Sequence, residues 1–158
     1  MKILHVALLI PTALLLASCA ASSADVSNTE KNSPAEAQAM KDPECVPADR
    51  IIVANFHATR RCVSCIAVGE MAQKTIEQEF QQEQRKGTVI FQSINGELPE
   101  NSEEVQKYQA RGSSLFINAI RNGEDTIEED VTVWRLAGNE EAYIRYLQEK
   151  LSALLYCS

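Results

Sequence analysis

Three short apolar runs in the later part of the chain have the length and composition of buried β-strands. Each is rich in β-branched or aromatic residues and is bounded by polar segments that favour turns or loops. We therefore predict a strand in each of these runs, which are residues 51–56, 88–94 and 115–120.

Two segments carry apolar residues at helical spacing and are predicted to be helices. The first follows the strand at 51–56 and is expected to run from Cys65 to about Gln82. The second is expected to begin near the C-terminus, after Asn139 as its N-cap. The residues expected to face the core are Val68, Met71, Ala72, Ile76 and Phe80 in the first helix, and Ile144, Leu147, Leu151 and Leu154 in the second.

Polar residues between these elements indicate a further helix and a hairpin. Asn101, followed three residues later by Glu104, has the spacing of a capping box at the start of a helix. The dipeptide Asn122-Gly123 favours a two-residue hairpin turn, so a return strand is expected around Thr126. Strands alternating with helices in this order predict a single α/β domain.

The first eighteen residues have the pattern of an export signal. A positive start precedes an apolar run that is too short and too interrupted to span a bilayer as a stable helix. The run ends at residues 16–19, Leu-Ala-Ser-Cys, which resemble the lipobox of bacterial lipoproteins. This resemblance implies that residues 1–18 are removed, that Cys19 is acylated, and that Ala20 favours the outer membrane, facing the periplasm. An ordinary signal peptide cleaved nearby, with Cys19 incidental, is the alternative.

The segment that follows is rich in Ala, Ser, Asn, Glu and Pro and contains only isolated apolar residues. Because it cannot bury a core of its own, it is interpreted as a flexible tether with a root-mean-square span of roughly 30 Å. The chain is thus divided into a signal peptide at 1–18, a lipidated N-terminus and tether at 19–49, and a folded domain at 50–158.

The charge balance excludes one class of partner. Fifteen Lys and Arg against 22 Asp and Glu give a formal net charge of -7, and the sequence has no basic cluster beyond Arg60-Arg61. Nucleic acid is therefore not expected as a partner, because neutralising phosphates requires a concentrated positive surface. The candidate chemistry lies instead in five cysteines, and the chain has only two histidines to join them in a metal site.

Two segments of the predicted domain resemble the thioredoxin superfamily. One is the strand at 51–56 that leads through His57 into the motif at 62–65, Cys-Val-Ser-Cys. The other is 107–117, which is similar to the thioredoxin segment carrying the loop opposite the active site. The resemblance implies a thioredoxin-like three-layer α/β/α fold with a central mixed sheet of about four strands. It also implies thiol–disulfide exchange without a cofactor, with protein thiols, protein disulfides or a redox partner protein as partners.

Several positions depart from the thioredoxin pattern. Ser114 occupies the place of the usual cis-proline, which changes how a substrate would dock. Asn55 stands where many thioredoxins have a buried acid, and His57 is the expected substitute because an amide cannot take up a proton. Arg61 replaces the aromatic residue before the first cysteine, and Val-Ser replaces Gly-Pro between the two cysteines.

The spacing of Cys62 and Cys65 suits a redox-active pair on general chemical grounds. Two thiols this close at a helix start can close a disulfide, and the helix dipole together with Arg60 and Arg61 favours the thiolate of the first. Cys62 is therefore the expected attacking sulfur and Cys65 the resolving sulfur. One alternative is a permanent bridge. The other is a carrier in which the two thiolates and His57 bind Cu(I), Zn or an arsenite-like thiophile without turnover.

Cys45 and Cys157 lie at the two ends of the domain and form the simplest remaining pair. Unpaired exposed thiols are a liability in an oxidising periplasm, so we expect a structural disulfide between them. A redox relay or an intermolecular link is the alternative. Together, these features predict a membrane-anchored periplasmic protein that exchanges thiols and disulfides.

Overall fold

The computed structural model describes residues 45–157 of the 158-residue chain. The predicted signal peptide, Cys19 and most of the predicted tether lie outside the described residues. Within residues 45–157, each helix is too short or too polar to span a bilayer.

A four-stranded mixed sheet forms the centre of the domain, in the strand order β2-β1-β3-β4. Strand β1 (Arg50–His57) pairs parallel with β2 (Val89–Asn95) and antiparallel with β3 (Ser114–Arg121). Strand β4 (Glu124–Glu129) pairs antiparallel with β3 through a two-residue turn. At this turn Asn122 and Gly123 have φ values of 52° and 82°, as the hairpin prediction requires.

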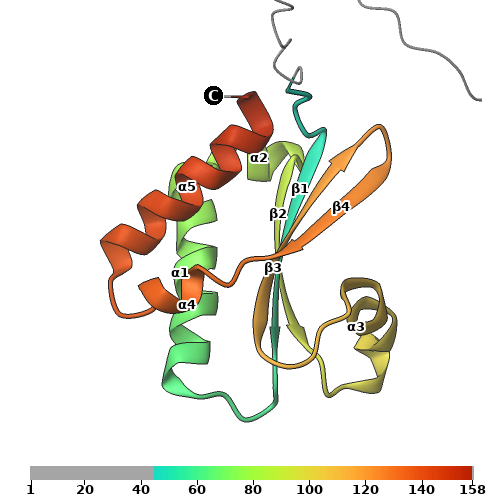
Figure 1. Ribbon diagram of the computed structural model, residues 1–158, viewed down its shortest axis with the longest axis vertical. Helices are drawn as coiled ribbons and strands as arrows, with labels where there is room; N and C mark the ends of the chain where they lie inside the picture. The colour runs from blue at the N-terminus through green and yellow to red at the C-terminus, as the bar shows by residue number, and fades with distance from the viewer. Residues whose placement is uncertain (1–44, 158) are drawn as a thin grey trace, which may run out of the picture. The chain divides into compact units, whose positions relative to one another are not determined.

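Helices cover both faces of the sheet and give the domain three layers (Figure 1). Helices α1 (Val63–Glu79) and α5 (Glu140–Tyr156) pack on one face, and α3 (Ser102–Tyr108) lies on the other. The short elements are α2 (Gln81–Lys86), the 3-10 turn η1 (Pro99–Asn101) and α4 (Val133–Leu136). This order of elements and strands is that of a thioredoxin-like α/β fold, so the predicted fold class is confirmed.

Strand β1 is central and is buried on both faces, which explains its continuous apolar sequence. Ile51 and Val53 belong to the larger core, which includes residues of α1 and α5. Ala54 and Phe56 belong to a smaller core beneath α3. In this smaller core the ring of Phe56 lies 5.3 Å from that of Tyr108 and 5.7 Å from that of Phe116, measured between centroids.

The predicted helices exist, but three details differ. Helix α1 begins at Val63, since Cys62 rather than Cys65 is at its start, and Phe80 separates it from α2. Asn101 is the N-cap of α3 as predicted, but the hydrogen bond of a capping box is missing, because its amide donates to the carbonyl of Asn95 instead. The element α4 was missed, since its four residues show no period.

The core-facing side of α5 differs from the predicted set at its two ends. Leu147 and Leu151 are fully buried as expected, whereas Ile144 and Leu154 are only partly buried. Tyr143 and Leu155 complete the buried stripe instead. The Tyr143 side chain fits there because its hydroxyl donates to the carbonyl of Val68 at 2.9 Å, which satisfies the polar end of a buried ring.

The folded part of the chain begins before Arg50. The Ala48 side chain is buried, and its backbone N–H donates to the carbonyl of Leu154 in α5 at 2.8 Å. The next N–H, of Asp49, donates to the carbonyl of Ile120 in β3 at 2.9 Å. The last residues assigned to the tether are therefore packed against the domain.

Candidate functional site

The Cys-x-x-Cys motif lies between the end of strand β1 and the N-terminus of helix α1. After β1 ends at His57, a short loop leads to Cys62, which has extended backbone angles and is the N-cap of the 17-residue helix. The Cys62 sulfur accepts a hydrogen bond from the backbone N–H of Cys65 at 3.1 Å. Because the first turn of α1 contains no acidic residue, the helix dipole and its free N–H groups favour a thiolate at Cys62 when the pair is reduced.

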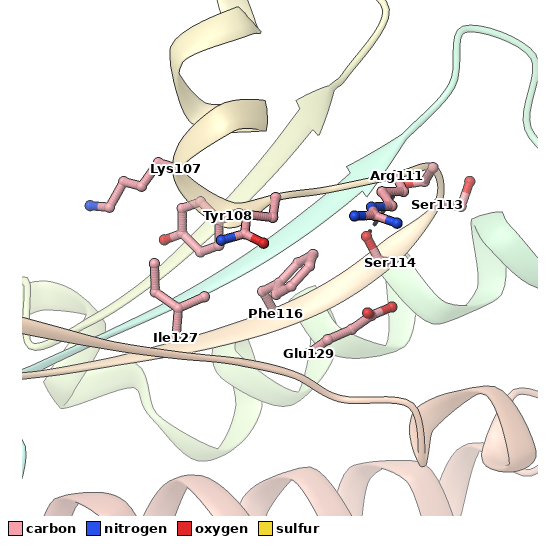
Figure 2. A pocket seen from close by; sticks show the side chains of 10 residues that line it. Lys107, Tyr108, Arg111, Ser113, Ser114, Phe116, Ile127 and Glu129 are labelled. Atoms are coloured by element: carbon pink, nitrogen blue, oxygen red, sulfur yellow. Dashed lines mark hydrogen bonds between the residues drawn. The ribbon is translucent and has the colours of Figure 1, made fainter.

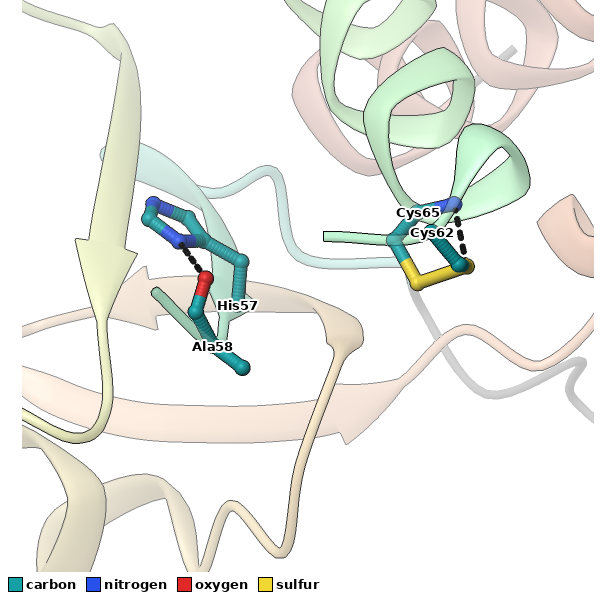
Figure 3. Close-up of a disulfide and its surroundings, with 4 residues drawn as sticks. All are labelled: His57, Ala58, Cys62 and Cys65. Carbon is teal, nitrogen blue, oxygen red and sulfur yellow. Dashed lines mark hydrogen bonds between the residues drawn. A yellow bond between two sulfur atoms is a disulfide. The ribbon is translucent and has the colours of Figure 1, made fainter. Parts of the chain in front are cut away.

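The two cysteines form a disulfide, with their Cα atoms 5.0 Å apart (Figure 3). Cys62 is exposed, whereas Cys65 is partly buried one turn into the helix. A thiolate from another molecule can therefore reach the Cys62 sulfur more readily than the Cys65 sulfur. This difference in exposure agrees with the roles expected for an attacking and a resolving cysteine.

His57 is engaged on both ring nitrogens by groups other than the cysteines. Its Nδ1 lies 3.0 Å from the carbonyl oxygen of Ala58, and its Nε2 is hydrogen-bonded to the guanidinium of Arg61. Since an arginine only donates, Nε2 is the acceptor in this hydrogen bond, and Nδ1 is the nitrogen that faces the carbonyl of Ala58. Figure 3 shows the imidazole pointing away from the disulfide. In this structure His57 therefore contacts Arg61 and the loop, and it does not face Cys65, for which it was the expected proton acceptor.

Arg60 and Arg61 bring positive charge next to Cys62 without contacting its sulfur. The guanidinium of Arg61 donates to His57 and, at 3.4 Å, to the hydroxyl of Ser93. Arg60 is exposed, and within the described part of the chain neither arginine has a carboxylate partner. Their charges are therefore not neutralised by an ion pair and act on Cys62 through space.

Asn55 lies behind the helix that carries the cysteines. Its side chain is only 3% exposed, and its Nδ2 has no hydrogen-bond partner among the described residues. Gly69, one turn beyond Cys65, leaves the room for it: a Cβ at Gly69 would lie 2.5 Å from that Nδ2. The buried polar position noted in the sequence is thus packed directly against α1, and only the structure shows that a glycine is needed there.

Ser114 starts β3 at the same end of the sheet. It pairs with Phe56, so it lies beside the carboxyl end of β1. Its side chain is buried and donates to the carbonyl of Gly112 at 3.2 Å, and Gly112 has a φ of 143° that favours glycine. The loop before Ser114 borders an open pocket of about 670 Å³ between α3 and β4, shown in Figure 2.

Exposed apolar side chains surround the disulfide end of the domain. Val63 is 85% exposed and Ile66 is 37% exposed, both within the first turn of α1. Val131, 60% exposed, follows Asp130, whose N–H donates to Leu115 at the start of β3. This surface was not predicted, although the positions of Val63 and Ile66 outside the apolar stripe of α1 could have indicated it.

The metal-carrier alternative lacks a third ligand in this arrangement. Among the residues that the structure describes, no group of three or more His, Cys, Asp or Glu side chains is placed to hold a metal ion. His57, the third ligand considered from sequence, uses both ring nitrogens for Ala58 and Arg61. No observation on residues 45–157 therefore favours this alternative over exchange chemistry.

A second disulfide joins Cys45 to Cys157, with Cα atoms 5.8 Å apart. It lies at the start of β1 and the end of α5, whereas the Cys62–Cys65 pair follows the end of β1. The eight residues of β1 alone span roughly 26 Å at the usual rise per residue. The two pairs therefore cannot exchange directly within one molecule, which rules out the relay alternative in that form.

Comparisons with known sequences identify no relatives of this chain. No protein-family model matches it, and no curated protein sequence matches it either.

Solved structures give weak matches. The human ERp44 zinc-bound form is 26% identical over 64% of this chain with a TM-score of 0.42, and the chain spans only 27% of that protein. A thioredoxin from Thermus thermophilus is 17% identical over 66% of this chain and 78% of its own, with a TM-score of 0.37. Because these TM-scores are low, the fold assignment rests on the strand order and connections described above.

Proposed function

We propose that this protein exchanges disulfides with protein thiols through Cys62 and Cys65, as a lipid-anchored protein of the periplasm. The observation that carries the proposal is the position of Cys62 in the fold. Cys62 is an exposed N-cap of a long helix, joined to a partly buried Cys65, at an end of the sheet that presents exposed apolar side chains. That combination provides a reactive sulfur, a resolving sulfur and a surface for a polypeptide.

The exchange proceeds in two steps, attack by Cys62 and resolution by Cys65. In the reduced protein the Cys62 thiolate attacks one sulfur of a substrate disulfide, and the other substrate sulfur leaves with the electron pair as a thiolate. Cys65 then loses its proton to solvent and attacks the Cys62 sulfur, which releases the second substrate thiolate. The substrate gains two electrons, and the Cys62–Cys65 disulfide present in this structure is restored. The same steps in reverse oxidise a substrate dithiol.

Insulin reduction in the presence of dithiothreitol tests this activity. The protein is expected to accelerate insulin precipitation, Cys62→Ser to abolish the acceleration, and Cys65→Ser to accumulate mixed disulfides through Cys62. A variant with both Cys45→Ser and Cys157→Ser, assayed at low temperature, is the matched control and should remain active. A Cys62→Ser variant as active as the unmodified protein would overturn the proposal. Stoichiometric metal bound to the reduced protein would favour the alternative function of a metal carrier.

The anchoring proposal rests on the lipobox-like residues that end at Cys19. An acyl group at Cys19 would be joined to the domain through the segment that is predicted to be a flexible tether. The described chain enters the domain at Cys45, beside the start of β1, and the redox pair follows the far end of that strand. A tether of this kind would hold the domain clear of the lipid surface, so that Cys62 could meet partners in the surrounding compartment.

Membrane fractionation with labelled fatty acid tests the anchor. The unmodified sequence is expected in the outer-membrane fraction and to incorporate the label, whereas Cys19→Ser should lose both. A Cys19→Ser protein that is still processed and membrane-bound would contradict the anchor while leaving the exchange chemistry intact.

A further inference from the structure

Three guanidinium groups gather at the redox end of a protein that is acidic overall. Arg60 and Arg61 precede Cys62 directly, and Arg111 lies in the loop that leads into Ser114. The formal net charge of the whole chain is -7, so this end differs in sign from the average surface.

None of the three arginines has a carboxylate partner within residues 45–157, whereas several other cations do. The ion pairs of the described domain join side chains on α1, α3, β4, α5 and the residues next to them. They are Lys74–Glu140, Lys107–Asp125, Arg145–Glu141, and Lys150 with Glu128 and Asp130. The positive charge of the three arginines is thus available to a molecule that binds at this end.

Arg111 stands at a pocket suited to a polypeptide side chain. Figure 2 shows its guanidinium beside Ser114, and the side chains of Phe116 and Glu129 line the same pocket. The pocket encloses about 670 Å³, is open to solvent, and begins at the loop that adjoins the end of β1. Arg111 also lines a smaller hollow together with His57 and Ala58, which places it beside the loop that leads to Cys62.

We infer that the polypeptide substrates of this site carry acidic side chains next to the reactive cysteine, with Arg111 as a specificity-determining residue. The inference rests on the proposed exchange function and names its substrate class. Two carboxylates adjoin the site. Glu97 accepts from the backbone N–H of Thr59, which lowers its pKa and keeps it ionised, and Glu129 lies across the pocket from Arg111. Lys107, which also lines the pocket, is balanced by its ion pair with Asp125. The three arginines against Glu97 and Glu129 therefore leave a positive balance, which favours an acidic segment over a basic one.

The preference is measured by comparing two peptides of opposite charge, first with the unmodified protein and then with a variant of Arg111. Taking the ratio of the two rates for each protein cancels the intrinsic reactivity of each peptide. Two peptides differ only in having Glu or Lys on both sides of one cysteine, and each is activated as a mixed disulfide with neutral 2-thiopyridine. The Cys62 thiolate of the reduced full chain forms a disulfide with the peptide sulfur, and 2-thiopyridine leaves with the electron pair. Its release is followed by absorbance, with the Cys62→Ser protein giving the background.

The expected result is a change in the ratio of the two rates. Replacing Arg111 by Glu should lower the Glu-peptide to Lys-peptide rate ratio by about threefold or more, and about 0.5 M salt should shrink this change. Arg85→Glu in α2 makes the same charge change at the other end of the domain and should leave the ratio unaltered. An unchanged ratio in Arg111→Glu overturns the inference alone, whereas failure of both peptides to react with the unmodified protein overturns the proposed function.

Discussion

The two disulfides of this domain are the same chemical bond in opposite structural settings. Cys45 and Cys157 are separated by 112 residues in sequence and join the two ends of the folded domain. Cys62 and Cys65 are separated by three residues, within the first turn of one helix. The first bond closes a loop of almost the entire domain, whereas the second closes a loop of one turn.

This difference predicts different physical roles. A cross-link removes conformations from the unfolded chain, and more of them when the loop is long, so the Cys45–Cys157 bond contributes mainly to stability. The short loop restricts the unfolded chain far less, and its sulfur at the N-cap of α1 is exposed and electrostatically favoured as a thiolate. The long-range bond is therefore structural and the local bond reactive.

The largest difference is expected between the losses of stability when each disulfide is removed in turn. Replacing Cys45 and Cys157 by serine is expected to lower the free energy of unfolding by about 2 to 5 kcal/mol, because the loop is long. Replacing Cys62 and Cys65 by serine should cost about 2 kcal/mol or less for the short loop. Urea unfolding followed by circular dichroism checks both, and equal losses would erase the distinction.

Packing behind the reactive pair is tested by Gly69→Ala. The added methyl would lie 2.5 Å from the Nδ2 of Asn55, so the buried amide must shift, and a loss of about 1 to 3 kcal/mol of stability is expected. Gly138→Ala is the matched control, since nothing lies within 4 Å of its added Cβ. Adding Asn55→Ala should recover part of the loss. Equal stability of the two alanine variants would show that the contact with Asn55 does not constrain the helix.

The two sulfurs of the reactive pair should differ in rate by about tenfold or more, which corresponds to about 1.4 kcal/mol. In the reduced protein Cys62 is expected to alkylate faster than Cys65 at neutral pH, because it is exposed at the helix N-terminus. Mass spectrometry of peptides after timed iodoacetamide labelling measures both rates. Faster labelling of Cys65 would instead identify Cys65 as the attacking cysteine and Cys62 as the resolving cysteine.

A smaller effect is expected from the charge of Arg61. Arg61→Glu places an anion beside Cys62, which disfavours the thiolate and should slow its alkylation at pH 7 by a few-fold, less at high salt. Arg61→Gln should give an intermediate rate, since it removes the cation without adding an anion. If all three proteins react at the same rate, the loop charges do not act on Cys62.

The smallest effect concerns the carboxylate of Asp125 in β4. Hydrogen bonds from Asn118 and then from Lys107 lower the pKa of Asp125 below its ordinary value. A carboxyl with a lowered folded-state pKa contributes stability above its unfolded pKa, near 4, and loses it as pH falls through the folded value. In the unmodified protein the free energy of unfolding is therefore expected to fall between pH 5 and pH 3. Asn118→Ala should make this fall smaller by less than about 1 kcal/mol, since Asp125 is partly exposed. Parallel pH curves for the two proteins would contradict the assignment.

The elements of the fold were predictable because they depend on local patterns. Continuous apolar runs gave the strands at 51–56, 88–94 and 115–120, and the Asn122-Gly123 turn was correct because few residue pairs accept two positive φ angles. Asn101 was correctly predicted as the start of α3, but the hydrogen bond of its side chain was not, because the amide donates to the carbonyl of Asn95.

By itself, the sequence determined the α/β order, the position of the Cys-x-x-Cys motif at a strand-to-helix junction, and the excess of negative charge. These properties follow from neighbours along the chain, where spacing and residue type are sufficient. Only the tertiary structure decided that His57 binds Arg61 instead of facing the cysteines, and that Gly69 makes room for Asn55. The structure also gave Arg111 its place in the wall of a pocket, which the resemblance of residues 107–117 did not specify. These contacts join residues on different elements, and their geometry is set by how the sheet and helices pack, which residue spacing does not encode.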